Sequence, residues 1–507
     1  GQFEQAKNFG SLIVPKLRDS AETLRMVEAR DFGGDLLLKE VQERVVAVLR
    51  MAEALSPKYH VVVANPPYMG GKGMNGRLAD WVKAHYPNSK SDLFSAFIER
   101  GLALVRSNGL SAMVTMESWM FLSSYEKLRG SILSRTTIQS MVHMPYLGKG
   151  GTAMGISFGT SAFVLFKKAT LDLKGQYCSV RYFETDEQHV PIEFPPKNER
   201  LTKASTRDFK DIPGSPIAYW ASEATLKNFR DFDLFKDHFS VRQGLATADD
   251  GRFVRNWSEI SISKSSLGGG AKWFPFHKGG EFRKWYGNND FLVNWENDGS
   301  EIRNFKGPDG KVRSRPQNIN YFFQPGITWS IISSGAPSFR SYDEGFVIGH
   351  VGPGIFSEGS LSRSQGLGFL NSTVAPHLLS IISETFKFEV GHLNRLPIPD
   401  NAPPSDTAVQ LVEIGRTDAD SDETSWDFTT LPLLSPDHRG ETLEDSYARL
   451  RAHWQGMTDE MQRLEEENNR MFIDAYGLQD ELTPEVPIDE ITLTCNPAYR
   501  YGVKGTE

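Results

Sequence analysis

The stretch Val61-Val62-Val63-Ala64-Asn65-Pro66-Pro67-Tyr68 (VVVANPPY) joins an apolar run to a polar tip that contains two prolines. The apolar run is typical of a buried parallel strand. The prolines end that strand, because proline lacks a backbone N–H and fixes φ. The loop that follows carries Gly70, Gly71, Gly73 and Gly76. Open α/β sheets place their chemistry at the carboxyl ends of parallel strands, so the sequence predicts a functional site at residues 65–68.

The side chains and carbonyls of this tip suit one chemical task. Asn65 offers a side-chain carbonyl oxygen, and Pro66 offers a backbone carbonyl whose direction is set by its ring. Two converging acceptors match an exocyclic amino group, which has two N–H donors. Tyr68 offers an aromatic face on which a planar base can stack. An amino group held in this way is polarised, and its nitrogen becomes available to attack an electrophile. The alternative interpretation is a proline-terminated strand and turn without chemistry.

Asn-Pro-Pro-Tyr after an apolar strand resembles the catalytic motif of amino-methyltransferases that use S-adenosylmethionine (SAM), especially the N6-adenine DNA enzymes. Longer stretches resemble the PglX methyltransferases of BREX phage-defence systems: NPPYMGGKGMN (65–75), YPNSKSDLFSAFIERGL (86–102), MVTMESWMFLSSYEKLR (113–129), KGGEFRKWYGN (278–288) and EEENNRMFIDAYGLQDELTPEVP (465–487). The resemblance implies that a target adenine leaves the DNA duplex and enters the site. Its amino nitrogen would then attack the methyl group of SAM. The resemblance assigns the catalytic tip to Asn65, Pro66, Pro67 and Tyr68, with Tyr68 stacking on the base.

Hydrophobic periodicity predicts an α/β fold around this tip. Helical spacing covers residues 15–57, and Gly33-Gly34 interrupts it, which predicts two helices. Downstream, strands alternate with helices. Strands are expected at 59–64, 110–115, 138–143, 161–166 and 180–184. One helix is expected to follow Ser91, which would cap it, and a second to span 118–133. This alternation is typical of a parallel sheet with helices on both faces. Together with the resemblance, it predicts a Rossmann-like, SAM-dependent methyltransferase fold.

In the family, the cofactor-binding segment comprises a strand, a glycine-rich turn and a helix, followed by a strand that ends in an acidic residue. No such segment precedes residue 59 here. The stretch NFGSLI (8–13), a candidate for the next strand region, lacks the acid that related enzymes often carry beside the glycine. The resemblance therefore implies a fragment, incomplete at its N-terminus, whose main SAM-binding element lies before Gly1. The cofactor-binding residues stay unassigned.

Two glycine-rich loops flank the predicted site. Residues 70–91 are expected to form a long polar loop in which Lys72 either contacts DNA or is simply solvated. Residues 148–159 are expected to form a second, flexible loop that carries Phe158 near its end. In related methyltransferases an aromatic at this place packs against the extruded base, opposite the catalytic tyrosine. Phe158 is therefore a second candidate for base stacking, with a core aromatic at a strand entry as the alternative.

Composition changes in a polar, proline-bearing connection at 186–215, and a domain boundary is expected near 200–215. The resulting division is a catalytic domain at 1–200, a second domain at 216–400 and a C-terminal region at 401–507. Short β-type runs separated by Gly, Asn and Asp turns predict that the second domain is an irregular β-rich α+β domain. The resemblance assigns it to DNA target recognition. Its interleaved aromatic and basic residues give DNA-contact candidates, each with surface charge as the alternative: Lys278, Arg283, Lys284, Lys311, Arg313 and Arg315.

Formal charge differs between the body and the tail of the chain. The total is −8, but residues 1–400 carry 48 basic and 41 acidic residues, whereas 401–507 carry 8 and 23. DNA affinity depends on local Lys and Arg density, so the total does not exclude DNA binding. The tail contains an acidic linker and then a helix with a seven-residue repeat from Leu443 to Ala475. This stripe is expected to pack on the chain's own helices, with a coiled-coil seam as the alternative, and the acidic residues are interpreted as solvated surface.

Other classes of protein find little support. No segment has the length and apolarity of a membrane span, and no signal-peptide pattern is present, so a cytoplasmic location is expected. Cys178 and Cys495 are too few for a disulfide framework, and the eleven histidines show no metal-ligand spacing, so no metal is expected. The stretch 308–311 (PDGK) resembles part of a metal-nuclease motif but is predicted to be a turn. The stretch 491–499 (ITLTCNPAY) lacks the second proline of the opening motif.

The function predicted from the sequence is site-specific methylation of adenine N6 in double-stranded DNA, with SAM as the methyl donor, within a BREX-like phage-defence system. The alternative is a DNA-recognition or scaffold subunit of a defence complex, in which this fragment does not catalyse by itself. Other phage-defence proteins are possible partners in either case. A third interpretation keeps the fold and changes the substrate to RNA or to a protein glutamine.

Overall fold

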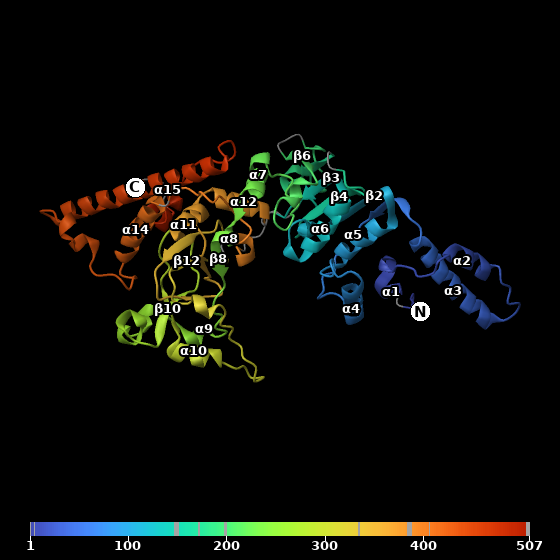
Figure 1. The fold of residues 1–507 in the computed structure, drawn as a ribbon, viewed down its shortest axis with the longest axis horizontal. Helices are drawn as coiled ribbons and strands as arrows, with labels where there is room; N and C mark the ends of the chain where they lie inside the picture. The colour runs from blue at the N-terminus through green and yellow to red at the C-terminus, as the bar shows by residue number, and fades with distance from the viewer. Residues whose placement is uncertain are drawn as a thin grey trace. The chain divides into compact units, whose positions relative to one another are not determined.

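A computed structural model describes residues 2–4, 6–146, 152–170, 173–196, 200–332, 335–382, 388–404 and 406–502. The chain divides into two compact units, Gly1–Ala221 and Ser222–Glu507 (Figure 1). The division falls just after the connection at 186–215 in which a boundary was expected. Residues 401–507 group with the second unit rather than forming a unit of their own.

The first unit is built on a six-stranded sheet with the order β1-β2-β4-β3-β5-β6. The strands are β1 (Tyr59–Ala64), β2 (Val105–Met116), β3 (Thr137–Met144), β4 (Thr160–Phe166), β5 (Lys174–Ser179) and β6 (Leu201–Ser205). Only the pairs β1–β2 and β3–β5 are parallel, and β4 runs antiparallel to both of its neighbours. The prediction of a parallel sheet was therefore wrong. A parallel return requires a crossover, usually a helix, and the described residues between β3 and β4 contain no helix.

Strand β1 lies at the edge of this sheet. It pairs in parallel with β2, as expected, but no other described strand pairs with it. Val61 is 52% exposed and Val63 is 74% exposed, so the prediction of a buried strand was wrong. The β-branched run forms a strand because it fits a pleated backbone, and that preference does not require burial on both faces.

The helices of the first unit agree with the sequence in some places and not in others. The predicted pair of helices before β1 is confirmed as α2 (Ser20–Glu28) and α3 (Leu36–Leu55), which lie side by side (Figure 1). Their N-termini are capped by Asp19 and Asp35. The stretch 8–13 forms no strand, because it spans the end of α1 (Ala6–Phe9) and a 3-10 turn at Gly10–Leu12.

Three further predictions need correction. The expected loop 70–91 contains α4 (Gly76–His85), which Asn75 caps and which buries Leu78 and Val82. The next helix, α5 (Leu93–Leu104), is capped by Asp92 rather than Ser91. The helix expected at 118–133 is shorter, α6 (Glu126–Arg135), and 3-10 turns precede it.

Two strands were also misplaced. The strand expected at 180–184 is a 3-10 turn (Tyr182–Glu184), and β5 precedes it. Strand β6 lies inside the predicted connection at 186–215. Part of the expected loop 148–159, residues 148–151, lies outside the described residues.

The core of the first unit lies between the sheet and helices α5 and α6. It contains the fully or nearly fully buried residues Phe94, Ile98, Trp119, Leu128, Phe163 and Tyr177, and Tyr68 packs against it. Arg129 is fully buried, and its guanidinium donates to the carbonyl oxygens of Trp119, Leu122 and Gly214. These bonds fix the turns between β2 and α6, because a buried cation without such acceptors would be strongly unfavourable.

The second unit is rich in short strands, as predicted. One four-stranded sheet has the order β14-β10-β11-β9 and the other β13-β12-β15-β8. Their strands are β8 (Phe239–Arg242), β9 (Val254–Asn256), β10 (Trp273–His277), β11 (Phe291–Asn294), β12 (Gly326–Trp329), β13 (Phe339–Tyr342), β14 (Val347–Ile348) and β15 (Gly354–Ser357). A two-stranded sheet pairs β7 (Asp233–Leu234) with β16 (Pro397–Ile398). Residues 308–311 form the predicted turn, in which Gly310 has φ +74°.

Helix α15 (Leu443–Tyr476) ends at Gly477 in the left-handed conformation, as predicted. Helix α15 packs against α14 (Asp406–Asp420) and α12 (Val374–Ile382). Within its apolar stripe, Leu450, Met461 and Leu464 are buried, Trp454, Met457 and Met471 are half-buried, and Leu443, Tyr447 and Ala475 are exposed. Packing on the chain's own helices is therefore confirmed for most of the stripe. Asn468 fills the gap in the repeat and donates to the Gly368 carbonyl oxygen. Within the described residues, no helix combines the length and apolarity needed to cross a bilayer.

Candidate active site

The tip after β1 has one buried and several accessible residues. Pro66 is buried, Asn65 and Pro67 are exposed, and Tyr68 is half-buried. The Tyr68 hydroxyl lies 3.4 Å from Asn65 Oδ1 and 3.3 Å from the carbonyl oxygen of Val114 in β2, and it can donate its proton to either. Burial raises the pKa of Tyr68 above its ordinary value, so the hydroxyl stays a donor. The amide oxygen that the sequence predicts for an amino group is thus accessible and oriented by a neighbour.

The two aromatics predicted to contact a base lie together in the structure. The rings of Tyr68 and Phe158 meet edge to face, with centroids 5.6 Å apart and an interplanar angle of 87°. Phe94 of α5 contacts Tyr68 in the same manner at 6.2 Å. A base between two parallel rings needs a gap of about 7 Å, twice the ~3.4 Å spacing of stacked bases. A base could therefore lie between Tyr68 and Phe158 only after Phe158 moves.

The loop after Tyr68 is held by Asp92, which the sequence reasoning missed. Asp92 Oδ1 accepts from the backbone N–H of Met69 at 2.8 Å and from that of Phe94 at 3.2 Å. The backbone N–H of Leu93 donates back to the Met69 carbonyl at 3.1 Å. Burial raises the pKa of Asp92 above its ordinary value, against the opposing effect of these N–H donors. The preference for Asp at helix N-caps is the signal that could have identified it.

A second polar network holds the loop that carries Phe158. Glu117 Oε2 lies 2.8 Å from Nε2 of the buried His143, whose Nδ1 lies 3.0 Å from the Tyr219 hydroxyl. The backbone N–H of Glu117 donates to the Gly159 carbonyl at 2.9 Å. A Cβ at Gly159 would overlap the Glu117 carboxylate, only 1.9 Å away. Phe158 is therefore attached to the ends of β2 and β3, and no sequence spacing signalled this network.

The described residues before β1 form helices and a 3-10 turn. The stretch 8–13 packs against α4 and α5 instead of forming a strand: Phe9 stacks on Trp81, and Tyr86 donates to the Leu12 carbonyl at 2.7 Å. In the described part of the chain before β1, no strand is assigned. Asn65 and the Pro66 carbonyl thus offer acceptors at the tip, and the residues that would hold SAM stay unassigned.

The DNA-contact candidates of the second unit fall into two groups. Lys278 pairs with Asp250 at 3.0 Å, and Arg283 lines a cavity with Asp290 and Asp422. The Lys284 ammonium lies 2.8 Å from the buried Glu465 carboxylate, and its side chain is only 11% exposed. Lys278 and Arg283 are thus half-buried beside carboxylates, and Lys284 forms a structural ion pair with the buried Glu465.

The other group lies on one hairpin. Lys311, Arg313 and Arg315 are exposed on the hairpin that a bridge between Lys306 and Val312 closes. Arg313 pairs with Asp309 at 3.2 Å, and the backbone of Arg315 pairs with that of Ala246. Lys72 of the first unit is also exposed. The hairpin cations are thus the accessible ones of the second-unit set.

The family model and the curated relatives that match this chain are described as methylases or methyltransferases. Residues 25–148 match the family model described as Eco57I restriction-modification methylase. The chain is 35% identical over 518 residues to "Adenine-specific methyltransferase BrxX" of Escherichia coli O9:H4 (strain HS), covering 99% of this chain and 41% of that protein. It is 35% identical over 519 residues to "Adenine-specific methyltransferase PglX" of Lacticaseibacillus casei (strain Zhang), covering 96% and 42%. The chain thus spans about two fifths of the length of these relatives.

Similar solved structures are more distant. The Type IIL restriction-modification enzyme MmeI in complex with DNA is 13% identical with a TM-score of 0.42, covering 87% of this chain and 57% of that chain. A nuclease-deletion mutant of the Type ISP enzyme LlaGI with a DNA substrate mimic is 12% identical with a TM-score of 0.40, covering 82% and 46%.

Proposed function

We propose that the chain belongs with the PglX-type adenine-specific methyltransferases to which it is 35% identical, and that it is the part of such an enzyme that holds the target adenine. The reaction is transfer of a methyl group from SAM to adenine N6 at specific sites in double-stranded DNA, in a phage-defence system. The observation that carries this proposal is the Asn-Pro-Pro-Tyr tip at the carboxyl end of β1, with Tyr68 against Phe158.

The residues of the tip have separate roles in this proposal. Asn65 Oδ1 and the Pro66 carbonyl accept the two N–H bonds of the adenine amino group, and Pro67 keeps the backbone rigid. These acceptors are set before the reaction, and they favour the transition state because positive charge develops on the nitrogen. Tyr68 stacks on the flipped base, and Phe158 moves aside and closes on its other face. SAM, when bound, supplies the methyl group.

Asp92 acts as a positioning residue in this proposal. It fixes the backbone at Met69, directly after Tyr68. The sheet of the first unit belongs, in this view, to a Rossmann-like SAM-dependent fold. The second unit binds the DNA target sequence. Its exposed hairpin with Lys311, Arg313 and Arg315 contacts phosphate groups, and such Lys and Arg contacts give an affinity that depends on salt. Lys72 of the first unit is a further candidate contact.

The test is the Asn65→Ala variant of the complete protein, with adenine methylation of host DNA as the measurement. We expect methylation to be abolished, whereas the variant of an exposed asparagine in the second unit, Asn320→Ala, should keep it. Methylation that survives in Asn65→Ala would refute the assignment of the tip.

A second candidate function is a DNA-recognition or scaffold subunit that does not catalyse by itself. The extent of the match leaves room for it, because the chain spans about two fifths of the length of its curated relatives. Titration of SAM into this chain, with DNA binding measured in parallel, separates the two. This candidate predicts weak or absent SAM binding together with retained DNA binding; tight SAM binding would contradict it.

A further inference from the structure

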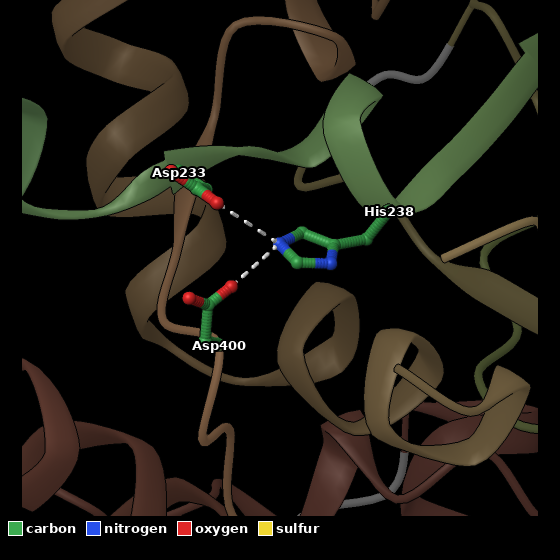
Figure 2. Close-up of side chains that lie close together, drawn as sticks. All are labelled: Asp233, His238 and Asp400. Carbon is green, nitrogen blue, oxygen red and sulfur yellow. Dashed lines mark ion pairs between the residues drawn. The ribbon is translucent and has the colours of Figure 1, made fainter. Parts of the chain in front are cut away.

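Three polar side chains from separate parts of the second unit converge beside the two-stranded sheet. Asp233 lies in β7, His238 ends α8 (Phe235–His238), and Asp400 follows β16 (Figure 2). One ligand atom from each lies within 4.8 Å of the other two. No sequence pattern indicates this cluster, because Asp400 is far from the other two residues in the chain.

The imidazole of His238 is the buried member. His238 is 5% exposed, and its Nε2 points at both carboxylates (Figure 2). That nitrogen lies 3.2 Å from Asp400 Oδ1 and 3.8 Å from Asp233 Oδ2, yet it makes no hydrogen bond of acceptable geometry. A buried polar atom without a hydrogen bond is unusual and calls for an explanation. Here the atom faces two anionic groups from a short distance without bonding to either.

We propose that Asp233, His238 and Asp400 bind a divalent transition-metal ion such as Zn²⁺. Ligand atoms about 2.0–2.1 Å from a tetrahedral ion lie roughly 3.3 Å from one another, and the two observed separations, 3.2 and 3.8 Å, bracket that value. The ion accounts for His238 Nε2, because its lone pair binds the metal and needs no hydrogen-bond donor. It also neutralises the two carboxylates.

The donor set selects the class of ion. Neutral imidazole suits Zn²⁺ and similar ions, whereas Ca²⁺ and Mg²⁺ prefer sites made of oxygen. The side chains of Asp233 and Asp400 are 60% and 74% exposed, so water completes the coordination. The nearby Asp237 is not a ligand, because its Oδ2 accepts from the Leu234 N–H at 3.0 Å.

A neighbouring hydroxyl orients the ring. Ser360 Oγ lies 3.3 Å from Nδ1 of His238, and the backbone carbonyl of His238 accepts from Gly359 at 2.8 Å. When Nδ1 carries the proton and donates to Ser360, Nε2 is left free for the metal, as in many metal sites where a partner fixes the other ring nitrogen. The bound ion joins the residues of β7 and α8 to the segment after β16, and so stabilises the second unit.

The competing explanation is an ion pair between a protonated His238 and the two carboxylates. Titration of Zn²⁺, and separately of Mg²⁺, into the chelator-treated 507-residue chain distinguishes the two by calorimetry. We expect one Zn²⁺ per chain at this site, weaker Mg²⁺ binding, and a higher melting temperature with Zn²⁺. His238→Gln and Asp400→Asn should each weaken Zn²⁺ binding by more than about tenfold.

The matched control is His453→Gln. His438 and His453 are close on the surface, with ring centroids 4.8 Å apart, and are another pair that added Zn²⁺ could contact. The control should leave the tight site unchanged. Because Asp400 is exposed, Asp400→Asn tests the site even if His238→Gln does not fold. The proposal is overturned by the absence of saturable Zn²⁺ binding, by binding that the site variants do not change, or by an Asp400→Asn melting difference that is identical with and without Zn²⁺.

Discussion

Removal of the Asp92 carboxylate tests how the Asn-Pro-Pro-Tyr tip is held. In Asp92→Ala, the backbone N–H groups of Met69 and Phe94 lose their acceptor, and α5 loses its N-cap. Hydrogen bonds to charged groups contribute about 1.5–3 kcal/mol each, and an N-cap about 0.5–2 kcal/mol. The bond from the Phe94 N–H is also the N-cap bond, so it is counted in both contributions. We therefore expect the free energy of unfolding to fall by about 2–4 kcal/mol.

Asp92→Asn separates the role of charge from that of the acceptor. The amide oxygen of the variant still accepts from the Met69 N–H. Because the amide is neutral, it avoids the cost of burying a charge, which is the effect that raises the pKa of Asp92. The free energy of unfolding should therefore change by less than about 1 kcal/mol. The exposed Asp80→Ala is the matched control, because its carboxylate caps no helix in the described fold.

The assay is urea denaturation, followed by tryptophan fluorescence, together with methylation by the complete protein. Since a raised pKa means that the folded state binds the proton more tightly, the Asp92 contribution to stability is largest below the unfolded-state pKa of about 3.9 and declines as pH rises through the folded-state pKa. Asp92→Asn should lack this decline. An Asp92→Ala variant as stable and as active as Asp80→Ala would refute the reasoning.

Three further predictions concern other contacts. Glu465→Ala leaves the Lys284 ammonium and the Trp285 indole N–H without their acceptor, and should lower the unfolding free energy of the second unit by about 3–5 kcal/mol in urea denaturation. Glu467→Ala removes a 44% exposed side chain that pairs with the surface residue Arg463, and should change this free energy by less than about 0.5 kcal/mol; equal effects would contradict a buried ion pair. Gly159→Ala places a Cβ 1.9 Å from the Glu117 carboxylate, whereas a Cβ at Gly76 meets nothing within 4 Å, so methylation by the complete protein should fall in Gly159→Ala and persist in Gly76→Ala. Lys311→Ala should weaken DNA binding similarly for all sequences and reduce the slope of affinity against salt by about 1; an unchanged slope would exclude a phosphate contact.

The sequence predicted the elements whose signals are local. The run 59–64, the break at Gly33-Gly34 and the end of α15 at Gly477 all depend on neighbouring residues, and all were confirmed. Strand direction is not local, so the antiparallel β4 was missed. Helix α4 was missed because glycines around it suggested a loop.

In the candidate site, too, features with a local sequence signal were predicted and contacts between distant residues were not. The tip and Phe158 were predicted, and the structure places Tyr68 against Phe158. The residues that hold them were not predicted: Asp92 is 23 residues from Met69, and Glu117 is 26 from His143. Contacts across such separations are made by the tertiary fold, and one sequence carries no periodic signal for them.

The exposed edge of β1 has a practical consequence for handling the chain. Among the described strands only β2 pairs with it, so its other edge presents backbone N–H and C=O groups beside Val61 and Val63. An edge of this kind is a template for strand addition by another molecule. Preparations of the 507-residue chain should therefore self-associate more as concentration rises, and a single lysine at position 63 should keep them monodisperse, because charged edge residues oppose such pairing.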